Sequence, residues 1–179
     1  MKQAFAISPP GKLAWVALIG LGGILPAVAV LLAALNTSAI TKWSLPQVLP
    51  LLLVLLAIGL IVGLLSLSLR RLAVELDGNT LVVRAALYTV RLPVTDLDLE
   101  HARIQSLQRG DEHWPCLRIN GMGLPGARLG HFRGHPFKRR LFCLLTHTQR
   151  VLVLPQCDGS RTLVLSLEHP QRLLDVLGH

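Results

Sequence analysis

One segment of the chain has the spacing of a nucleotide-binding glycine loop. Residues 121–126, GMGLPG, repeat the Gly-x-Gly-x-x-Gly pattern that lies between a strand and a helix and holds phosphate on backbone N–H groups. Here strand-like residues follow the loop instead of a helical pattern, and a proline stiffens it. We therefore predict a structural turn whose glycines supply positive φ angles. The residues of this predicted turn are Gly121, Gly123, Pro125, Gly126 and Gly130.

The densest positive patch follows at residues 133–140, RGHPFKRR. Basic side chains at a membrane surface attract anionic lipid head groups, each contributing about 1 kcal/mol, and the ring of Phe137 can enter the interface. The alternative is a solvated hairpin whose charges keep it soluble while Phe137 packs into the domain. Nucleic acid is disfavoured, because no recognition motif appears and the positive balance beyond Leu72 is modest. The residues predicted to bind lipid or a partner are Arg133, His135, Phe137, Lys138, Arg139 and Arg140.

Patterns that would indicate catalysis or metal binding are weak. The seven histidines lie between His101 and His179 and lack the spacing of a metal site. The serines have no nucleophile-elbow context, and Cys143 and His147 would be far apart along a continuous strand. Three cysteines, an odd number, fit reduced thiols in a cytosolic domain. We predict a protein that is not an enzyme and that has no metal and no cofactor.

The elements that must carry these residues divide the chain into two halves. Residues 13–41 and 43–69 contain no Asp, Glu, Lys, Arg or His. A bilayer core of about 30 Å needs roughly 20 helical residues, so we predict transmembrane helices over residues 13–35 and 45–69, joined by a short loop at residues 36–44. A cleaved signal peptide is the alternative, but its apolar core is only about 7–15 residues long, and a second apolar run follows the first.

Features within the two spans indicate anchoring and packing. Pro26 predicts a kink in the first span, because proline removes a helix hydrogen bond. Trp15 and Trp43 suit the boundary between water and lipid. Gly59 and Gly63 form a small-xxx-small pair that lets another helix approach closely, although glycine is also common in membrane helices generally. Strongly polar side chains occur only near the span ends, so we expect no transport site.

Basic residues near the span ends predict the orientation of the chain. Arg70 and Arg71 follow the second span and two lysines precede the first, whereas only Lys42 lies in the connecting loop. Cytoplasmic segments of membrane proteins are enriched in Lys and Arg. We therefore place the N-terminal segment, residues 1–12, and the domain at residues 72–179 in the cytoplasm, with the loop outside.

Beyond the second span the apolar period changes from helical to alternating. Residues 72–76 alternate as a half-buried strand, and residues 77–79, DGN, form a turn into a second strand. A third strand should end at Pro93, and Pro170 suits the first turn of a final amphipathic helix. Many short strands with one such helix predict a small barrel or sandwich with the helix over one opening. Further strands are expected at residues 104–107, 117–119, 128–133, 141–146, 151–154 and 162–165.

The centre of this second half resembles a known family. Residues 117–126, LRINGMGLPG, followed by GHFR at residues 130–133, resemble the centre of a bacterial pleckstrin-homology-like (PH-like) domain family, and residues 166–170 resemble its entry into a final helix. The resemblance covers roughly residues 72–177 and departs at Ala127, where the family pattern has an aromatic residue. It implies a bent, mainly β barrel closed by a C-terminal helix, in proteins that often carry membrane spans before the domain.

The two halves together predict a membrane-anchored binding or scaffold module. A two-helix transmembrane hairpin would hold a PH-like barrel at the cytoplasmic face of a bacterial inner membrane. There the barrel would bind a protein partner or anionic lipid head groups. The chain could also form a homo-oligomer. The alternative is a structural or assembly subunit of a membrane complex that acts through its helices, in which case the glycine pair matters more than the β domain.

Overall fold

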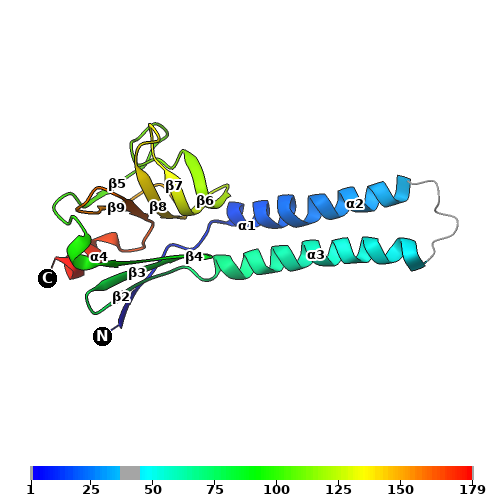
Figure 1. Cartoon of the computed structure of the whole chain (residues 1–179), viewed down its shortest axis with the longest axis horizontal. Helices are drawn as coiled ribbons and strands as arrows, with labels where there is room; N and C mark the ends of the chain where they lie inside the picture. The colour runs from blue at the N-terminus through cyan, green and yellow to red at the C-terminus, as the bar shows by residue number, and fades with distance from the viewer. Residues whose placement is uncertain (1, 37–44, 179) are drawn as a thin grey trace.

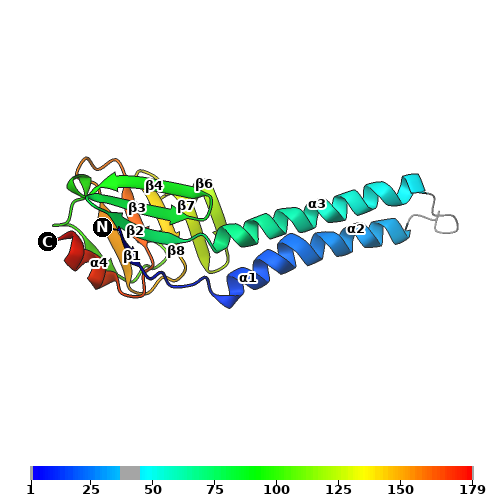
Figure 2. The same cartoon turned by 90° about the horizontal axis from the view of Figure 1, so that it is seen from below.

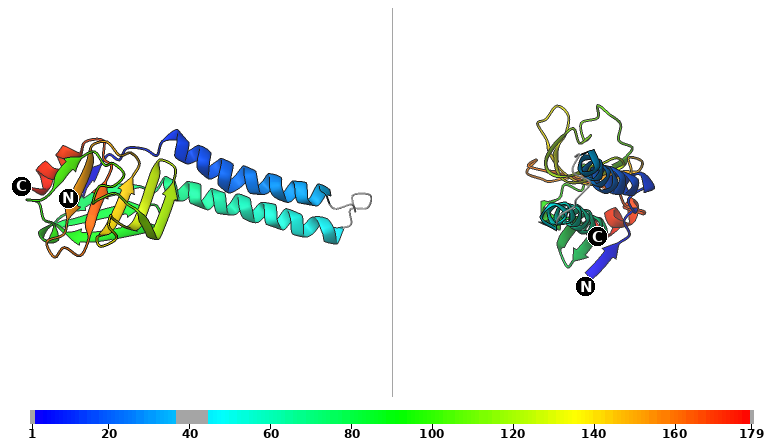
Figure 3. Two further views of the ribbon diagram at one scale, coloured as in Figure 1. Left: turned by 90° about the horizontal axis from the view of Figure 1, so that it is seen from above. Right: turned by 90° about the vertical axis from the view of Figure 1, so that its right-hand side faces the viewer.

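The computed structural model describes residues 2–36 and 45–178. Two long helices lie side by side and leave the same end of a β region, as Figures 1 and 3 show. The predicted loop at residues 36–44 lies, apart from Asn36, outside the described residues, and so does Trp43.

The first helix is continuous but changes its winding just before Pro26. It consists of α1 (Lys12–Ile19), the π-helical turn η1 (Gly20–Ile24) and α2 (Leu25–Asn36). Proline cannot donate a backbone hydrogen bond to the preceding turn, and the wider winding of η1 accommodates the missing bond. The irregularity expected at Pro26 therefore takes the form of a π-helical turn.

The second helix, α3 (Leu45–Leu69), runs almost directly into the β region, because only residues 70–72 separate it from strand β2. The stretches Lys12–Leu35 and Val48–Leu69 are long and apolar enough to cross a membrane. Within their most apolar windows only 6% and 0% of the residues are buried. Neither helix is therefore the covered core helix of a soluble domain.

The described strands form two sheets. One is four-stranded and antiparallel, in the order β1-β2-β3-β4, and the other is six-stranded, in the order β5-β9-β10-β8-β7-β6, with β10 and β8 parallel. The strands are β1 (Lys2–Phe5), β2 (Ala73–Asp77), β3 (Thr80–Ala85), β4 (Tyr88–Pro93), β5 (Arg103–Gln105), β6 (Leu117–Leu124), β7 (Ala127–Arg133), β8 (Arg140–Leu145), β9 (Val151–Pro155) and β10 (Thr162–Leu165).

The predicted mainly β region and C-terminal helix are confirmed, but no closed barrel forms among the described residues. The reason lies after β4, where the short helix η3 (Val94–Asp96) leads the chain to the other sheet. Strand β5 then pairs with β9 instead of β4, so the two sheets keep separate edges.

The inward faces of the two sheets share one apolar core. Leu81 of the first sheet and Phe142 of the second are fully buried members of it. Helix α4 (Pro170–Leu177) covers the end of this core that lies away from the helices (Figure 1). It contributes the buried side chains of Leu173 and Leu177, four residues apart on one face.

The ends of the two long helices close the opposite end of the same core. Trp15 and Leu65 pack against the core, and Leu18 and Leu69 belong to it, with exposed fractions of 4% and 2%. The helices and the β region are therefore one packed unit.

The segment before the first helix is also part of the β region. Strand β1 pairs antiparallel with β2, with Phe5 opposite Val74, and Figure 2 shows it alongside β2. Further along, Ile7 forms a bridge with Leu167, which follows β10 in the other sheet. Residues 2–8 thus form a strap across both sheets, a feature that no pattern in the sequence of residues 1–12 predicted.

Candidate functional site

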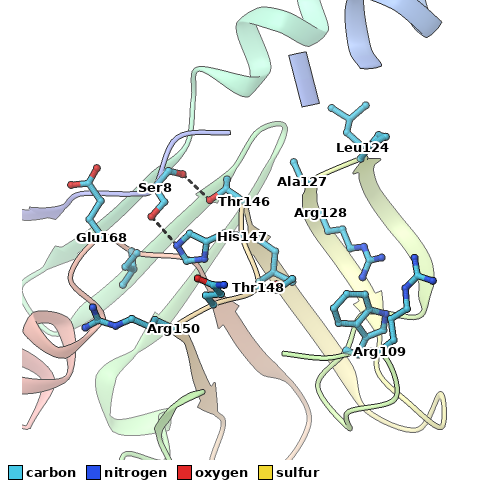
Figure 4. Close-up of a pocket in the computed structure, with 16 residues that line it drawn as sticks. Ser8, Arg109, Leu124, Ala127, Arg128, Thr146, His147, Thr148, Arg150 and Glu168 are labelled. Carbon is cyan, nitrogen blue, oxygen red and sulfur yellow. Dashed lines mark hydrogen bonds between the residues drawn. The ribbon is translucent and has the colours of Figure 1, made fainter. Parts of the chain in front are cut away.

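The end of the six-stranded sheet nearest to the helices surrounds a cleft of about 670 Å³. The strand register places Arg128 opposite Leu145 and Leu165 opposite Leu152, so the β6–β7 turn, the end of β8 and the start of β9 share this end. Strand β6 contacts α1 here. Figure 4 shows six polar residues that line the cleft: Ser8, Arg109, Arg128, Thr146, His147 and Arg150.

Hydrogen bonds hold the strap and the β8–β9 loop against each other. The Thr146 hydroxyl donates to the backbone oxygen of Ser8 at 2.7 Å, and Ser8 Oγ lies 3.0 Å from His147 Nε2 (Figure 4). From the other side, Ser166 Oγ accepts from the Thr146 N–H at 3.2 Å and donates to the His147 backbone oxygen at 2.9 Å. These bonds fix the position of this wall, so the cleft is preorganised for a ligand.

Ser8 and His147 have the atoms of a nucleophile and a base, but the third group of a catalytic triad is missing. The Nδ1 atom of His147 is buried and has no hydrogen-bond partner among the described residues. No carboxylate therefore orients the ring, as activation of a serine requires. Cys143, the other nucleophile near His147 in sequence, lies in an apolar cluster where burial raises the pKa of its thiol and keeps it protonated.

Positive charge dominates the cleft. Its lining contains three arginines, Arg109, Arg128 and Arg150, against one carboxylate, Glu168. None of these arginines has a carboxylate partner among the ion pairs of the described residues. With three arginines and one carboxylate in its lining, the cleft therefore carries an excess of positive charge.

Arg128 is the most confined of these cations. Its guanidinium lies 4.3 Å from the centre of the Trp114 ring and donates to the Pro115 backbone oxygen at 3.2 Å. Burial lowers the pKa of Arg128, and neighbouring Arg109 lowers it further. Because an arginine pKa starts so high, the group stays charged. Arg128 is half-buried and Arg109 is exposed, and two like-charged guanidinium groups that lie near each other favour an anion between them.

No family model, curated protein or solved structure matches this chain. Among the described residues, no group of three His, Cys, Asp or Glu side chains is arranged to hold a metal ion. What the cleft can bind therefore follows from its own geometry and charge.

The predicted basic turn, residues 133–140, lies at the other end of β7 from the cleft. Six residue steps separate Ala127 from Arg133 in this strand, a distance of about 20 Å at roughly 3.3 Å per residue. Within the turn, Arg133 donates to the Phe137 backbone oxygen at 3.2 Å, and Arg139 forms an ion pair with Glu112.

The remaining predicted residues of the basic turn are exposed. His135, Lys138 and Arg140 face solvent, and Phe137 is 51% exposed, so its ring does not pack into the core. The turn is a protruding, positively charged surface at the end of the strands away from α1, and none of its residues lines the cleft.

The turn between β6 and β7 is confined to Pro125 and Gly126, whereas Gly121 and Gly123 lie within β6 and Gly130 lies within β7. Of the four predicted turn glycines, Gly126 and Gly130 adopt positive φ angles, so the prediction is wrong for Gly121 and Gly123. Gly126 adopts a φ of +83°, which the turn requires and a glycine adopts without strain. Strand β7 crosses close to β6, because a Cβ atom at Gly121 would lie 2.7 Å from the Leu129 backbone oxygen. A strand follows this loop, so the N–H groups of a helix N-terminus are not available to a phosphate.

The predicted helix-packing glycines, Gly59 and Gly63, do not face the first helix. A Cβ atom at either position would have no heavy atom within 4 Å. The close approach is made instead by η1, where a Cβ at Gly23 would lie 3.6 Å from Val62 Cγ2. The Gly59–Gly63 face of α3 is open.

Sequence reasoning singled out none of the cleft residues for binding. Ser8, Arg109 and Arg128 come from three separate segments, and His147 and Arg150 from a fourth, the β8–β9 loop, so none of these segments alone has the pattern of a binding motif. The available signal was faint: Arg128, His147 and Arg150 each lie at or next to the end of a strand, where side chains from neighbouring strands meet.

Proposed function

We propose that this chain is a membrane-anchored binding module of PH-like type. Its two helices cross a bacterial inner membrane and hold the β domain at the cytoplasmic face, where the domain binds a protein partner or anionic lipid head groups. The module works without a catalytic residue, metal or cofactor. The observation that carries this proposal is the packing of the helix ends into the core of the β domain.

That packing sets how the domain meets a bilayer. Leu18 and Leu69 are buried with the core residues of the sheets, and residues 70–72 are the only link between α3 and β2. A domain mounted in this way cannot swing away from the membrane as one on a flexible linker can. The basic cleft, which lies at the helix-proximal end, then faces the head-group region together with Arg70 and Arg71.

The pairing of β1 with β2 supports uncleaved helices with both ends on one side. Strand β1 precedes the first helix and β2 follows the second, yet they are hydrogen-bonded neighbours. Cleavage after the first helix would remove a strand from the sheet. Together with the Arg pair after the second span, this pairing favours a cytoplasmic location for both termini.

The PH-like assignment depends on residues 117–126 and 130–133, which build most of the β6–β7 hairpin. A C-terminal helix over one end of a mainly β domain fits that family. In this proposal the chain is an open, two-sheet variant of the family's barrel.

Cysteine labelling in intact cells tests the proposal. In a variant without Cys116, Cys143 and Cys157, a cysteine at Thr41 should react with a membrane-impermeant maleimide, and one at Gly178 should react only after lysis. Labelling of Gly178→Cys in intact cells would place the domain outside the cytoplasm. Labelling of both sites would show that the helices do not cross the membrane as a hairpin.

A second candidate function is an assembly subunit that acts through its helices. The open Gly59–Gly63 face of α3 favours it, because a helix of another copy or of a partner can approach there closely. Deletion of the β domain distinguishes the two candidates. In the first it abolishes binding of the partner or lipid, whereas in the second the helices still associate with their partner.

A further inference from the structure

The basic cleft and an apolar groove along the first helix adjoin at the tip of the β6–β7 turn. The groove has a volume of about 560 Å³ and follows α1, η1 and the start of α2 between residues 13 and 28. Pro125, at the tip of the β6–β7 turn, lines both the groove and the cleft. Side chains along the groove are exposed; the exposed fraction is 66% for Val16 and 65% for Leu21.

The two spaces differ in chemistry. On the cleft side, Arg109 lies near Arg128, and Arg150 lies on the other side beyond His147, as Figure 4 shows. The guanidinium of Arg128 stacks on Trp114. On the groove side, every lining residue is apolar or glycine. A molecule that fills both spaces must have an anionic head and an apolar tail.

We propose that the cleft and the groove together bind one anionic phospholipid from the surrounding leaflet. Its phosphate lies against Arg109 and Arg128, Arg150 faces the rest of the head group, and one acyl chain passes Pro125 and follows the first helix. The inference rests on the proposed function, because the lipid comes from the membrane that the helices cross.

Geometry favours a phosphate-bearing lipid over other anions. The planar fork of a guanidinium matches phosphate oxygens, and the half-buried position of Arg128 strengthens its attraction relative to open water. The cleft volume is typical of sites for small ligands and exceeds the needs of a free phosphate. A soluble phosphate ester would leave the groove beyond Pro125 unfilled, whereas a lipid fills it with a chain that is already at that depth.

The test is native mass spectrometry of the full-length protein released from a neutral detergent. The probes are phosphatidylglycerol and phosphatidylcholine with identical acyl chains, and sn-glycerol 3-phosphate represents the head group without a tail. We expect one phosphatidylglycerol to be retained per chain, more tightly than phosphatidylcholine, and we expect glycerol phosphate not to displace it.

Two kinds of variant probe the two ends of the lipid. Arg150→Gln removes an exposed cation, and Arg128→Gln removes the confined one. Loss of one charge-assisted contact should weaken phosphatidylglycerol binding about tenfold. Gly20→Phe adds a ring to the groove at a position where a Cβ meets nothing within 4 Å, and it should weaken retention of both lipids. The matched control is Arg172→Gln, an exposed arginine of α4 that lines neither the cleft nor the groove, and it should leave binding unchanged.

Three results would overturn the lipid site. These are equal retention of the two lipids, full retention by Arg150→Gln, and displacement by glycerol phosphate, which would assign the cleft to a soluble ester. If Arg128→Gln fails to fold, Arg150→Gln still tests the lipid site, because the Arg150 side chain is exposed and its replacement should not affect folding. Cysteine labelling is independent of all three results, so the anchored topology stands or falls separately.

Discussion

The β domain cut out as residues 72–179 should be much less stable than the same domain in the full chain. The cut removes the helix ends that close one end of the core, including Leu18, and exposes the space that Leu69 fills. These two leucines are 4% and 2% exposed. Full burial of a leucine contributes about 1.5–3 kcal/mol, so their loss costs roughly 3–6 kcal/mol.

The cut also removes strand β1. Its four residues pair with β2 in the antiparallel register, which corresponds to about four ladder hydrogen bonds. At a net 0.5–1.5 kcal/mol each, these bonds contribute roughly 2–6 kcal/mol. A typical domain is stable by only about 5–15 kcal/mol. The two losses together bring the fragment close to its unfolding threshold.

Urea unfolding followed by far-ultraviolet circular dichroism measures this effect. The comparison fragment carries residues 2–10 joined to Leu72 by a Gly/Ser linker. The linker can be short because Pro10 and Leu72 line one pocket, separate from the groove along the first helix. We expect restored β1 to raise the free energy of unfolding by roughly 2–6 kcal/mol, the contribution of its ladder. If both fragments unfold at the same urea concentration with the same slope, β1 contributes nothing and the reasoning fails.

Three further predictions follow from particular residues. Replacing Gly59 and Gly63 with Leu should reduce any detergent-resistant oligomer on a native gel without lowering monomer stability, because neither position contacts the first helix; an unchanged oligomer would exclude this face as the contact. Gly130→Ala should destabilise the domain by at least about 2 kcal/mol in urea unfolding, since φ is +107° and the added Cβ would lie 2.8 Å from the Asn120 backbone oxygen. The matched Gly110→Ala, at a φ of +103° in open space, should cost only the backbone strain of about 1–2 kcal/mol, and equal losses would argue against a steric effect at Gly130. His113 is 3% exposed, and burial lowers its pKa; because the unfolded chain takes up the proton first, stability should be complete above about pH 6.5 and fall below it. Thermal unfolding of the full chain and of His113→Gln at pH 7.5 and pH 5 checks this, and an identical pH dependence in both would refute it.

Local patterns in the sequence specify most of the elements. Residues 13–41 contain no ionisable side chain, and the alternation at residues 72–76 has a clear period, so the first helix and strand β2 could be predicted. Strand β1 could not, because four residues are too short to show a period and their partner lies beyond both helices. The two sheets keep separate edges because β5 pairs with β9 and not with β4. This pairing depends on long-range contacts that a local sequence pattern does not contain.

The same distinction applies to the site. The charges of residues 133–140 are contiguous, so sequence reasoning found the basic turn and its exposure follows from a hairpin. Arg109, Arg128 and Arg150 are each isolated in the sequence, and they converge because of the β7–β8 register and the loops at that end of the sheet. The strap then brings Ser8 to His147 from the far end of the chain.

The position of β1 and β2 on either side of both helices also imposes an order of assembly in the cell. The ribosome delivers β1 first, but its partner emerges only after the second helix has been made. A nascent chain in which just one helix has entered the bilayer would hold β1 and β2 on opposite sides, where they cannot pair. In the proposed topology the sheet can therefore be completed only after both helices have entered the bilayer, and a misinserted chain would expose an unpaired strand edge.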